Sequence, residues 1–152
     1  MNNTVILLTG IPASGKSTFY KTYFFPEYVY VSLDQLKSRS AEQELFLFCL
    51  RRDKHCVIDN TNITRAQRQV YIRAAKASGA RVVGYCFVTD KDSAIERNTL
   101  RSGRALVPEV AIRAMYQALE YPQLSEGYDE LYFVRMIGTT FDVEKYDENY
   151  TR

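Results

Sequence analysis

Short apolar runs alternate with stretches of helical periodicity along the whole chain. Five runs are apolar enough, and end clearly enough in glycine or polar residues, to predict buried strands. They span residues 4–10, 28–32, 55–59, 80–88 and 130–135. The first, TVILLTG, is apolar almost up to its closing glycine, which is typical of a strand in the interior of a sheet.

The segments between these runs have helical spacing. They predict helices over residues 16–25, 34–52, 64–78, 90–101 and 108–121. Pro26 follows the first, Gly79 is a C-cap signal after the third, and Pro108 suits the first turn of the last. Strands that alternate with helices predict an α/β fold, with a five-stranded parallel sheet flanked by helices on both faces.

Parallel sheets of this kind bind ligands at the carboxyl ends of their strands. In this chain that edge would bring together Gly10, Ser32, Asp59 and Val88. The loops after these positions are therefore where candidate functional residues are expected.

At 152 residues the chain is expected to form one domain, residues 1–152, with a core of its own. Apolar residues make up 46% and charged residues 25% of the sequence, as in an ordinary soluble protein. The formal net charge is only +2, so bulk charge does not indicate a nucleic-acid binder. Binding of nucleic acid would need local clusters of lysine and arginine.

The cysteines and the N-terminus indicate which classes of protein the chain does not resemble. Cys49, Cys56 and Cys86 lack the spacing of a zinc site or a disulfide framework, and are expected to be buried apolar side chains. The N-terminus does not have the pattern of a signal peptide, and no stretch approaches the roughly 18 apolar residues of a membrane span. These features predict a soluble, cytoplasmic protein without a membrane partner.

The most specific local signal is GIPASGKST, between the first strand and the first helix. It comprises Gly10, Ile11, Pro12, Ala13, Ser14, Gly15, Lys16, Ser17 and Thr18. It matches G-x-x-x-x-G-K-[ST], the P-loop, whose glycines let backbone N–H groups point at phosphate beside a helix N-terminus. Lys16 would reach the β- and γ-phosphates, and the Ser17 hydroxyl would bind Mg²⁺. The motif predicts binding of ATP or GTP and leaves the phosphate acceptor open.

Asp34 lies just past the second strand. In a phosphotransferase, an aspartate here would accept the proton of the attacking hydroxyl. The same position suits an acid at the start of a helix, and position alone favours neither interpretation. Lys37 lies one helical turn further on, where it would face the same cleft or be a solvated surface lysine.

The third strand runs into VIDNTN, where an apolar run becomes polar. P-loop enzymes often have an acid near Mg²⁺ at the position of Asp59. Asn60, Thr61 and Asn62 would hydrogen-bond a ligand, or begin the next helix.

A basic segment, ERNTLRSGRALVP, contains Arg97, Arg101 and Arg104. Arg97 and Arg101 share a helix face, where two like charges repel mildly unless an anion lies between them. An arginine segment that closes on the triphosphate would stabilise the transferring group, whereas the alternative is a basic helix end that complements the helix dipole. The P-loop elsewhere in the chain favours the first, which predicts a lid at about residues 97–108.

Taken together, these motifs resemble those of the polynucleotide 5′-hydroxyl kinase family, which includes a phage repair enzyme and the kinase half of animal polynucleotide kinase–phosphatases. GIPASGKST, Asp34 with a basic residue three positions on, DNTN, RNTLRSGRALVP and PQLSEGYDEL occur in the family's order, from about Val5 to Val134. The P-loop is shared with many proteins. The DNTN run, the RN-x-x-R-x-G segment followed by VP, and the late P-x-L-x-E-G-Y segment are far more specific in combination.

The resemblance implies an adenylate-kinase-like P-loop NTPase fold with an arginine-bearing lid. It implies ATP- and Mg²⁺-dependent phosphorylation of a 5′-hydroxyl end of DNA or RNA. The implied catalytic residues are Asp34 as general base, Arg101 as the essential lid arginine, Lys16, and Asp59 beside the metal. Arg97 and Arg104 would assist or hold the nucleobase, and the implied acceptor contacts are Lys37, Asn60, Thr61 and Asn62.

Two features depart from the family. Lys37 occupies the position where an arginine would hold the acceptor's own 3′ phosphate, and a lysine offers a point charge instead of a planar fork. Binding of that phosphate would therefore be weaker or have a different geometry. No phosphatase motif of the DxDGT type is present, so a kinase alone is expected.

Two other functions stay open. A P-loop kinase of a small metabolite, nucleoside or antibiotic would share the fold, and the mild net charge favours it slightly. A continuous basic groove formed by Lys21, Lys37 and the lid arginines, leading away from Asp34, would argue against it. A nucleotide-binding module without phosphoryl transfer is the third possibility, against which Asp34 and the lid arginines count. The tail, residues 141–152, is expected to be a surface segment or frayed end, or to pack near the nucleobase. The sequence does not indicate an oligomeric state.

Overall fold

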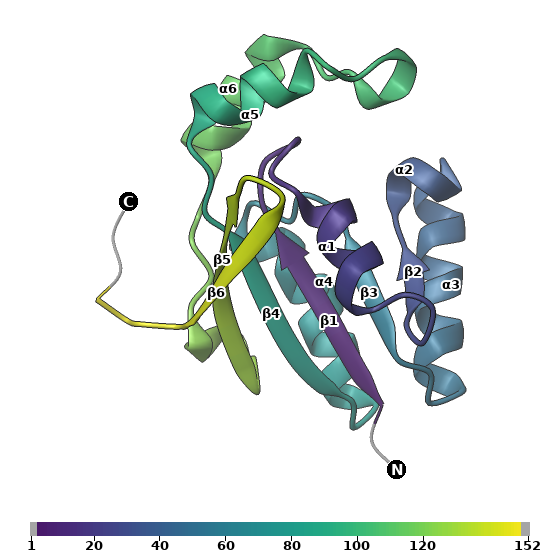
Figure 1. Ribbon diagram of the computed structural model, residues 1–152. Coiled ribbons are helices and arrows are strands. Elements are labelled where there is room, and N and C mark those ends of the chain that lie inside the picture. Colours follow the sequence, from purple (N-terminus) through teal and green to yellow (C-terminus); the bar gives the residue numbers. More distant parts are fainter. Residues whose placement is uncertain (1–2, 150–152) are drawn as a thin grey trace.

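The structure, a computed structural model, describes residues 3–149, except for the side chain of Arg104. Its centre is a six-stranded sheet in the order β2-β3-β1-β4-β5-β6 (Figure 1). The strands are β1 (Thr4–Thr9), β2 (Val29–Val31), β3 (Cys56–Asp59), β4 (Arg81–Phe87), β5 (Glu130–Ile137) and β6 (Thr140–Lys145). The first five are parallel, as predicted, and the P-loop strand β1 lies between β3 and β4.

The sixth strand corrects the prediction for the end of the chain. Residues 141–145 lie mostly at the surface, as predicted, but they are not a frayed end, because they pair antiparallel with β5 as an edge strand. The alternation of Phe141 and Val143 with acidic residues is the period-two signal that indicates a strand there. Phe141 packs edge-on against Phe19 of the first helix. Residues 150–152 lie outside the described residues.

The helices also match the predictions, with one correction. They are α1 (Lys16–Tyr23), α2 (Leu33–Leu36), α3 (Arg39–Arg51), α4 (Arg65–Ala77), α5 (Lys91–Asn98) and α6 (Glu109–Ala118). A single helix over residues 34–52 is wrong because the chain breaks after α2. Lys37 there has a left-handed backbone, with φ 64°, and the side chain of Ser38 accepts a hydrogen bond from the Ala41 N–H at 3.0 Å. Ser38 thereby caps a new helix, α3.

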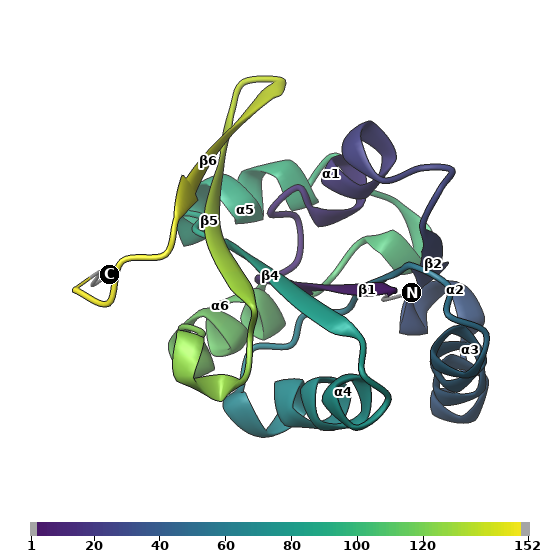
Figure 2. The same ribbon diagram turned by 90° about the horizontal axis from the view of Figure 1, so that it is seen from below.

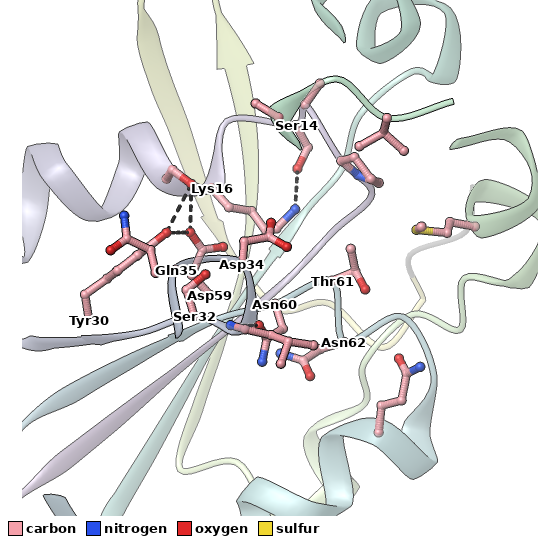
Figure 3. A pocket seen from close by; sticks show the side chains of 18 of the residues that line it. Ser14, Lys16, Tyr30, Ser32, Asp34, Gln35, Asp59, Asn60, Thr61 and Asn62 are labelled. Atoms are coloured by element: carbon pink, nitrogen blue, oxygen red, sulfur yellow. Dashed lines mark hydrogen bonds between the residues drawn. The ribbon is translucent and has the colours of Figure 1, made fainter. Parts of the chain in front are cut away.

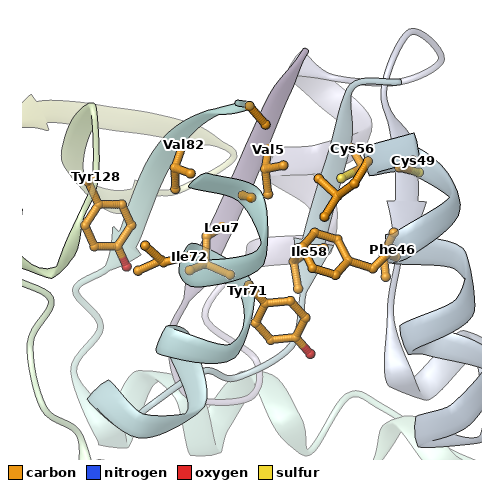
Figure 4. Close-up of a cluster of buried hydrophobic side chains, with 14 of the residues drawn as sticks. Val5, Leu7, Phe46, Cys49, Cys56, Ile58, Tyr71, Ile72, Val82 and Tyr128 are labelled. Atoms are coloured by element: carbon orange, nitrogen blue, oxygen red, sulfur yellow. The ribbon is translucent and has the colours of Figure 1, made fainter. Parts of the chain in front are cut away.

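Alternate residues of the central strand face two separate apolar clusters. Val5 and Leu7 of β1 pack toward α3 and α4, whereas Ile6 and Leu8 pack toward α1. Figure 2 shows α3 and α4 on one side of the sheet and α1 on the other. Side chains of β1, β3 and β4 meet Phe46 of α3 and the residues of α4 (Figure 4). The three cysteines are buried, as predicted.

Helices α5 and α6 lie above the carboxyl edge of the sheet, and the segment between them extends toward α2 (Figure 1). The segment between α5 and α6 contains a short 3₁₀ turn, η1 (Gly103–Ala105). A second 3₁₀ turn, η2 (Leu124–Glu126), lies between α6 and β5. A third apolar cluster of Ile11, Ala94 and Ile112 attaches α5 and α6 to the P-loop. Within residues 3–149, no helix combines the length and the apolar character that crossing a membrane requires.

Candidate active site

The P-loop is shaped by its backbone. Gly15 has φ 102°, a backbone conformation that other residues adopt only with strain, and it lies against the flexible end of the Met136 side chain in β5. The loop curls around the Lys16 side chain. The Lys16 amine donates hydrogen bonds to the carbonyls of Gly10 and Ile11, each at 2.9 Å. A buried amine surrounded by the loop suits a phosphate group, which would offer it a full negative charge.

The charge of Lys16 depends on its neighbours. Burial lowers its pKa to about 8, the Asp59 carboxylate opposes that shift, and the Arg101 guanidinium adds to it. Asp34 also raises the Lys16 pKa, although it comes from a different element. Two cations and two carboxylates therefore act on one another across a single site, and an anion between Lys16 and Arg101 would relieve their repulsion.

Ser17, Tyr30 and Asp59 form a hydroxyl–carboxylate cluster at the first turn of α1. The Ser17 hydroxyl donates to Asp59 Oδ2 at 2.8 Å, and the Tyr30 hydroxyl donates to the same oxygen. Burial, followed by the Asp59 charge, raises the pKa of the Tyr30 phenol. Tyr30 thus stays a hydrogen-bond donor that orients Asp59. This role could not be predicted from the sequence, where Tyr30 is only an aromatic residue in a strand.

This cluster fits Mg²⁺ better than a metal that needs a complete protein cage. In the part of the chain that the structure describes, no group of three or more His, Cys, Asp or Glu side chains could hold a metal ion. Ser17 and Asp59 offer adjacent oxygen atoms at the P-loop. Mg²⁺ typically uses one or two such ligands and completes its shell with water and phosphate oxygens.

A cavity of about 860 Å³ opens at the carboxyl edge of the sheet and contains both the P-loop and Asp34. Figure 3 shows Lys16, Asp34 and Asp59 converging on it from three different elements. Asp34 lies in α2, a single helical turn with no buried residue, and is itself exposed to the cavity. Most of the predicted site residues line this cavity, among them Ser14, Lys16, Ser17, Asn60, Thr61 and Asn62.

Asn60 connects Asp34 to the body of the protein. Its Oδ1 accepts a hydrogen bond from the N–H of Leu33, the residue before Asp34, at 2.9 Å. Its Nδ2 donates to Glu42 of α3 at 3.0 Å and to the Tyr71 hydroxyl of α4 at 3.1 Å. Both ends of the Asn60 amide are therefore engaged by the protein.

Thr61 and Asn62 hold the P-loop strand in place. The carbonyl of Thr61 accepts a hydrogen bond from the Gly10 N–H at 2.9 Å. Asn62 has a left-handed backbone, with φ 47°, and its Nδ2 donates to the Leu8 carbonyl at 3.0 Å. Asparagine tolerates this conformation better than most residues. The polar end of VIDNTN thus links β3 to β1 as well as facing the cavity.

A buried ion pair lies beneath that loop. Arg68 of α4 donates from Nε to Glu126 at 2.8 Å, and from its Nη1 to the Asn62 carbonyl at 2.9 Å. Both side chains of the pair are almost fully buried. Glu126 belongs to the late P-x-L-x-E-G-Y segment, whose partner could not be identified from spacing. Through Arg68, the late segment is connected to Asn62, the last residue of the DNTN run.

The arginines of the basic segment occupy different places. Arg101 lines the cavity, and its Nη1 lies 3.3 Å from the Ala105 carbonyl. Arg97 donates from Nε to the Ala13 carbonyl of the P-loop at 2.7 Å, which joins α5 to the loop. The side chain of Arg104 lies outside the described part of the chain, so its predicted contact with nucleotide stays a prediction.

The part of the cavity beside Asp34 differs from what spacing indicates. Lys37 is exposed at the end of α2 and does not belong to the cavity wall, and neither does Lys21. Arg39 and Gln43, on the first turns of α3, do line it. The helix break at Ser38 produces this change because it places the start of α3, rather than the end of one long helix, beside Asp34.

Comparison with known proteins agrees with this architecture. A family model described as an AAA domain, AAA_33, matches residues 41–122, more than half of the chain. A bifunctional polynucleotide phosphatase/kinase of Schizosaccharomyces pombe is 27% identical over 128 residues, which make up 82% of this chain and 31% of that protein. A protein of Acanthamoeba polyphaga mimivirus whose name also contains bifunctional polynucleotide phosphatase/kinase is 30% identical over 134 residues, 84% of this chain and 32% of that protein. The chain spans about a third of the length of these relatives.

Solved structures give the same fold at low sequence identity. Kti12 of Chaetomium thermophilum, in complex with ADP-AlF3, has a TM-score of 0.66 and 17% identity, over 86% of this chain and 88% of that one. A gluconokinase from Sinorhizobium meliloti has a TM-score of 0.60 and 17% identity, over 87% and 82% of the two chains. Likenesses at this identity show the fold alone, a P-loop α/β fold that binds nucleotide in the Kti12 complex.

Proposed function

Because the chain belongs to the AAA domain family AAA_33 and is a P-loop phosphotransferase of the kinase type, we propose that it transfers the γ-phosphate of ATP to the 5′-hydroxyl end of DNA or RNA. The observation that supports this most is that one cavity contains both the P-loop and the exposed carboxylate of Asp34. Similarity to polynucleotide phosphatase/kinases over most of this chain supports the acceptor class.

On the donor side, Lys16 would exchange its two carbonyl contacts for the β- and γ-phosphates of ATP. Ser17 and Asp59 would hold Mg²⁺, with Tyr30 keeping the Asp59 carboxylate oriented. The ion, when bound, supplies positive charge to the phosphate oxygens.

On the acceptor side, Asp34 would take the proton of the attacking hydroxyl. The hydroxyl oxygen forms a bond to the γ-phosphorus, the bond from that phosphorus to the β-phosphate oxygen breaks, and ADP leaves. The exposed position of Asp34 in the cavity supports this role because an acceptor end must reach it.

Residues 97–108 would act as the lid of a single kinase domain spanning residues 1–152. Arg101 faces the cavity, where it would stabilise charge on the transferring phosphoryl group. Arg97, held on the Ala13 carbonyl, would keep α5 against the P-loop and assist at the nucleotide, with Arg104 as a further contact.

Arg39 is the better candidate than Lys37 for an anionic part of the acceptor. It lines the cavity, and its guanidinium can bind a phosphate through two parallel hydrogen bonds. Thr61, also in the wall, would contact the acceptor directly. Asn60 and Asn62 would act mainly through the hydrogen bonds that they already make within the protein.

A kinase of a small hydroxylated metabolite is the second candidate. The observation in its favour is that Lys21 and Lys37 lie outside the cavity wall, so the basic groove expected for a long polyanion is not formed by those residues. The α/β fold shared with a gluconokinase is compatible with either acceptor.

Transfer of labelled γ-phosphate from ATP with Mg²⁺ tests the proposal. The acceptors are 5′-hydroxyl DNA and RNA oligonucleotides, nucleoside 3′-monophosphates, nucleosides and a panel of sugars. We expect labelling of the oligonucleotides, lost in Arg101→Ala. Labelling of a sugar or nucleoside with none on the oligonucleotides would support the second candidate instead.

A further inference from the structure

Glu42, on the first turn of α3, is buried in a way that needs an explanation. Its side chain is fully buried, and the cation nearest to it, Arg39, is 3.4 Å away and 66% exposed to solvent. A buried carboxylate is costly unless it is fully hydrogen-bonded, and a mostly exposed arginine offsets little of that cost.

Four donors converge on this carboxylate. Oε2 accepts hydrogen bonds from the Tyr71 hydroxyl at 2.6 Å and from Asn60 Nδ2 at 3.0 Å, and it lies 3.4 Å from Arg39 Nη1. Oε1 accepts from Gln43 Nε2 at 3.0 Å. All four partners line the active-site cavity on the side of Asp34, whereas Glu42 does not line it. Glu42 therefore lies behind the cavity wall and holds four residues of that wall.

One of these contacts leads to the proposed base. Because Asn60 Nδ2 is committed to Glu42 and Tyr71, Asn60 Oδ1 is left to accept the Leu33 N–H. Leu33 begins α2, a one-turn helix with no buried residue, so packing alone does little to fix the position of Asp34. The hydrogen bond to Asn60 ties the start of α2 to side chains of α3 and α4, through Glu42 and Tyr71.

We propose that Glu42 is a positioning residue for the acceptor half of the site. It would act through Asn60 on α2 and Asp34, and through Arg39 and Gln43 on the wall that meets the acceptor, without touching the acceptor itself. This inference rests on the proposed function. It adds a reason for retaining a costly buried carboxylate: only a carboxylate can accept from all four donors.

The test is Glu42→Gln, which keeps the shape and changes the hydrogen bonding. A glutamine has one acceptor oxygen and adds two N–H donors, so the donors of Tyr71, Asn60 and Gln43 can no longer all be satisfied. We expect kcat/KM for the acceptor to fall about 10- to 100-fold, and the KM for ATP to stay within about twofold of wild type. Tyr71→Phe removes one donor and should shift the same parameters less. Glu44→Gln, an exposed position on the same helix, is the matched control.

Hydrogen exchange provides a readout that needs no acceptor. The Leu33–Leu36 amides should exchange faster in Glu42→Gln and Tyr71→Phe, while the P-loop amides and the Glu44→Gln control stay at the wild-type rate. Unchanged exchange in α2, or equal losses for ATP and acceptor, would overturn the positioning role. If the wild type labels no nucleic-acid end, the proposed function fails, and hydrogen exchange still decides whether Glu42 positions α2. If Glu42→Gln does not fold, the exchange rates of Tyr71→Phe decide whether this network positions α2.

Discussion

The two halves of the cavity are built by different means. On the P-loop side the main chain makes the site: Lys16 is held by two carbonyls, Gly10 is bonded to the Thr61 carbonyl, and Gly15 has a backbone conformation that side chains disfavour. On the Asp34 side, a one-turn helix is held by the side chain of Asn60, which is itself bonded to Glu42 of α3 and Tyr71 of α4. The first half is held by hydrogen bonds to main-chain atoms, whereas the second depends on a network of side-chain hydrogen bonds.

The difference in construction matters because the proposed function requires one cavity both to bind a triphosphate and to select an acceptor. A site made by backbone groups tolerates side-chain change around it and binds a constant partner, such as a triphosphate. A site made by side chains can be altered by single substitutions, which would suit the selection of an acceptor in the proposed function. Variants should therefore divide into those that impair both halves and those that impair one.

Arg101→Ala is expected to have the largest effect because Arg101 lines the cavity and its charge acts on Lys16 of the P-loop. We expect kcat to fall on the order of 10³-fold or more, as for other arginine fingers, with stability unchanged. Steady-state transfer assays and thermal melts measure the two quantities. Arg113→Ala, at an exposed position on α6, should behave as wild type; a similar loss there would mean that α6 as a whole, rather than Arg101, is what matters.

Asp34→Asn should impair only the acceptor half. Asparagine keeps the size of the side chain but cannot accept the proton, so kcat should fall about 10²- to 10⁴-fold. Isothermal titration calorimetry should give an ATP affinity close to that of the wild type. Near-normal turnover would show that another group accepts the proton.

The pH dependence of ATP binding should report on the P-loop half alone. The Lys16 pKa is about 8 in the nucleotide-free protein, and phosphates would raise it in the complex. Above pH 8 the free protein has lost a proton that the complex retains, so ATP affinity should fall by up to about tenfold per pH unit, while below pH 8 this group contributes no dependence. Calorimetry at pH 9 in two buffers of different ionisation enthalpy should detect proton uptake that is absent at pH 6.5. No uptake at pH 9 would contradict the assignment.

Arg39→Ala and Lys37→Ala are expected to have the smallest effects, and they test which of the two cations contacts the acceptor. Loss of Arg39 removes the cation that α3 contributes to the wall, so the acceptor KM should rise about tenfold, equivalent to about 1.4 kcal/mol. Lys37→Ala should change it less than twofold because Lys37 lies outside the wall. Initial-rate kinetics over a range of oligonucleotide concentrations distinguish the two. The opposite ranking would restore Lys37 as the acceptor contact.

The features that could be predicted from sequence are those encoded locally. Five strands and the P-loop follow from consecutive residues, and Asp34 and Asp59 follow from their position just after or at the end of a strand. The break at Lys37–Ser38 was missed because an N-cap serine inside a helical pattern is a weak signal. Glu42 looks like an ordinary first-turn acid, and its partners Asn60 and Tyr71 are 18 and 29 positions away. Such networks are formed by tertiary packing and leave no periodicity in the sequence.

The β5–β6 hairpin also has a practical use. Met136 and Phe141, on either side of its turn, both approach Gly15 of the P-loop, whereas Thr4 begins β1 at the opposite end of the sheet (Figure 1). Gly138, in the turn itself, has open space around it. A fluorophore attached at that turn would lie on an element in direct contact with the P-loop and could serve as an optical sensor of nucleotide occupancy. An affinity tag placed before β1 would be far from that contact and should leave the sensor unperturbed.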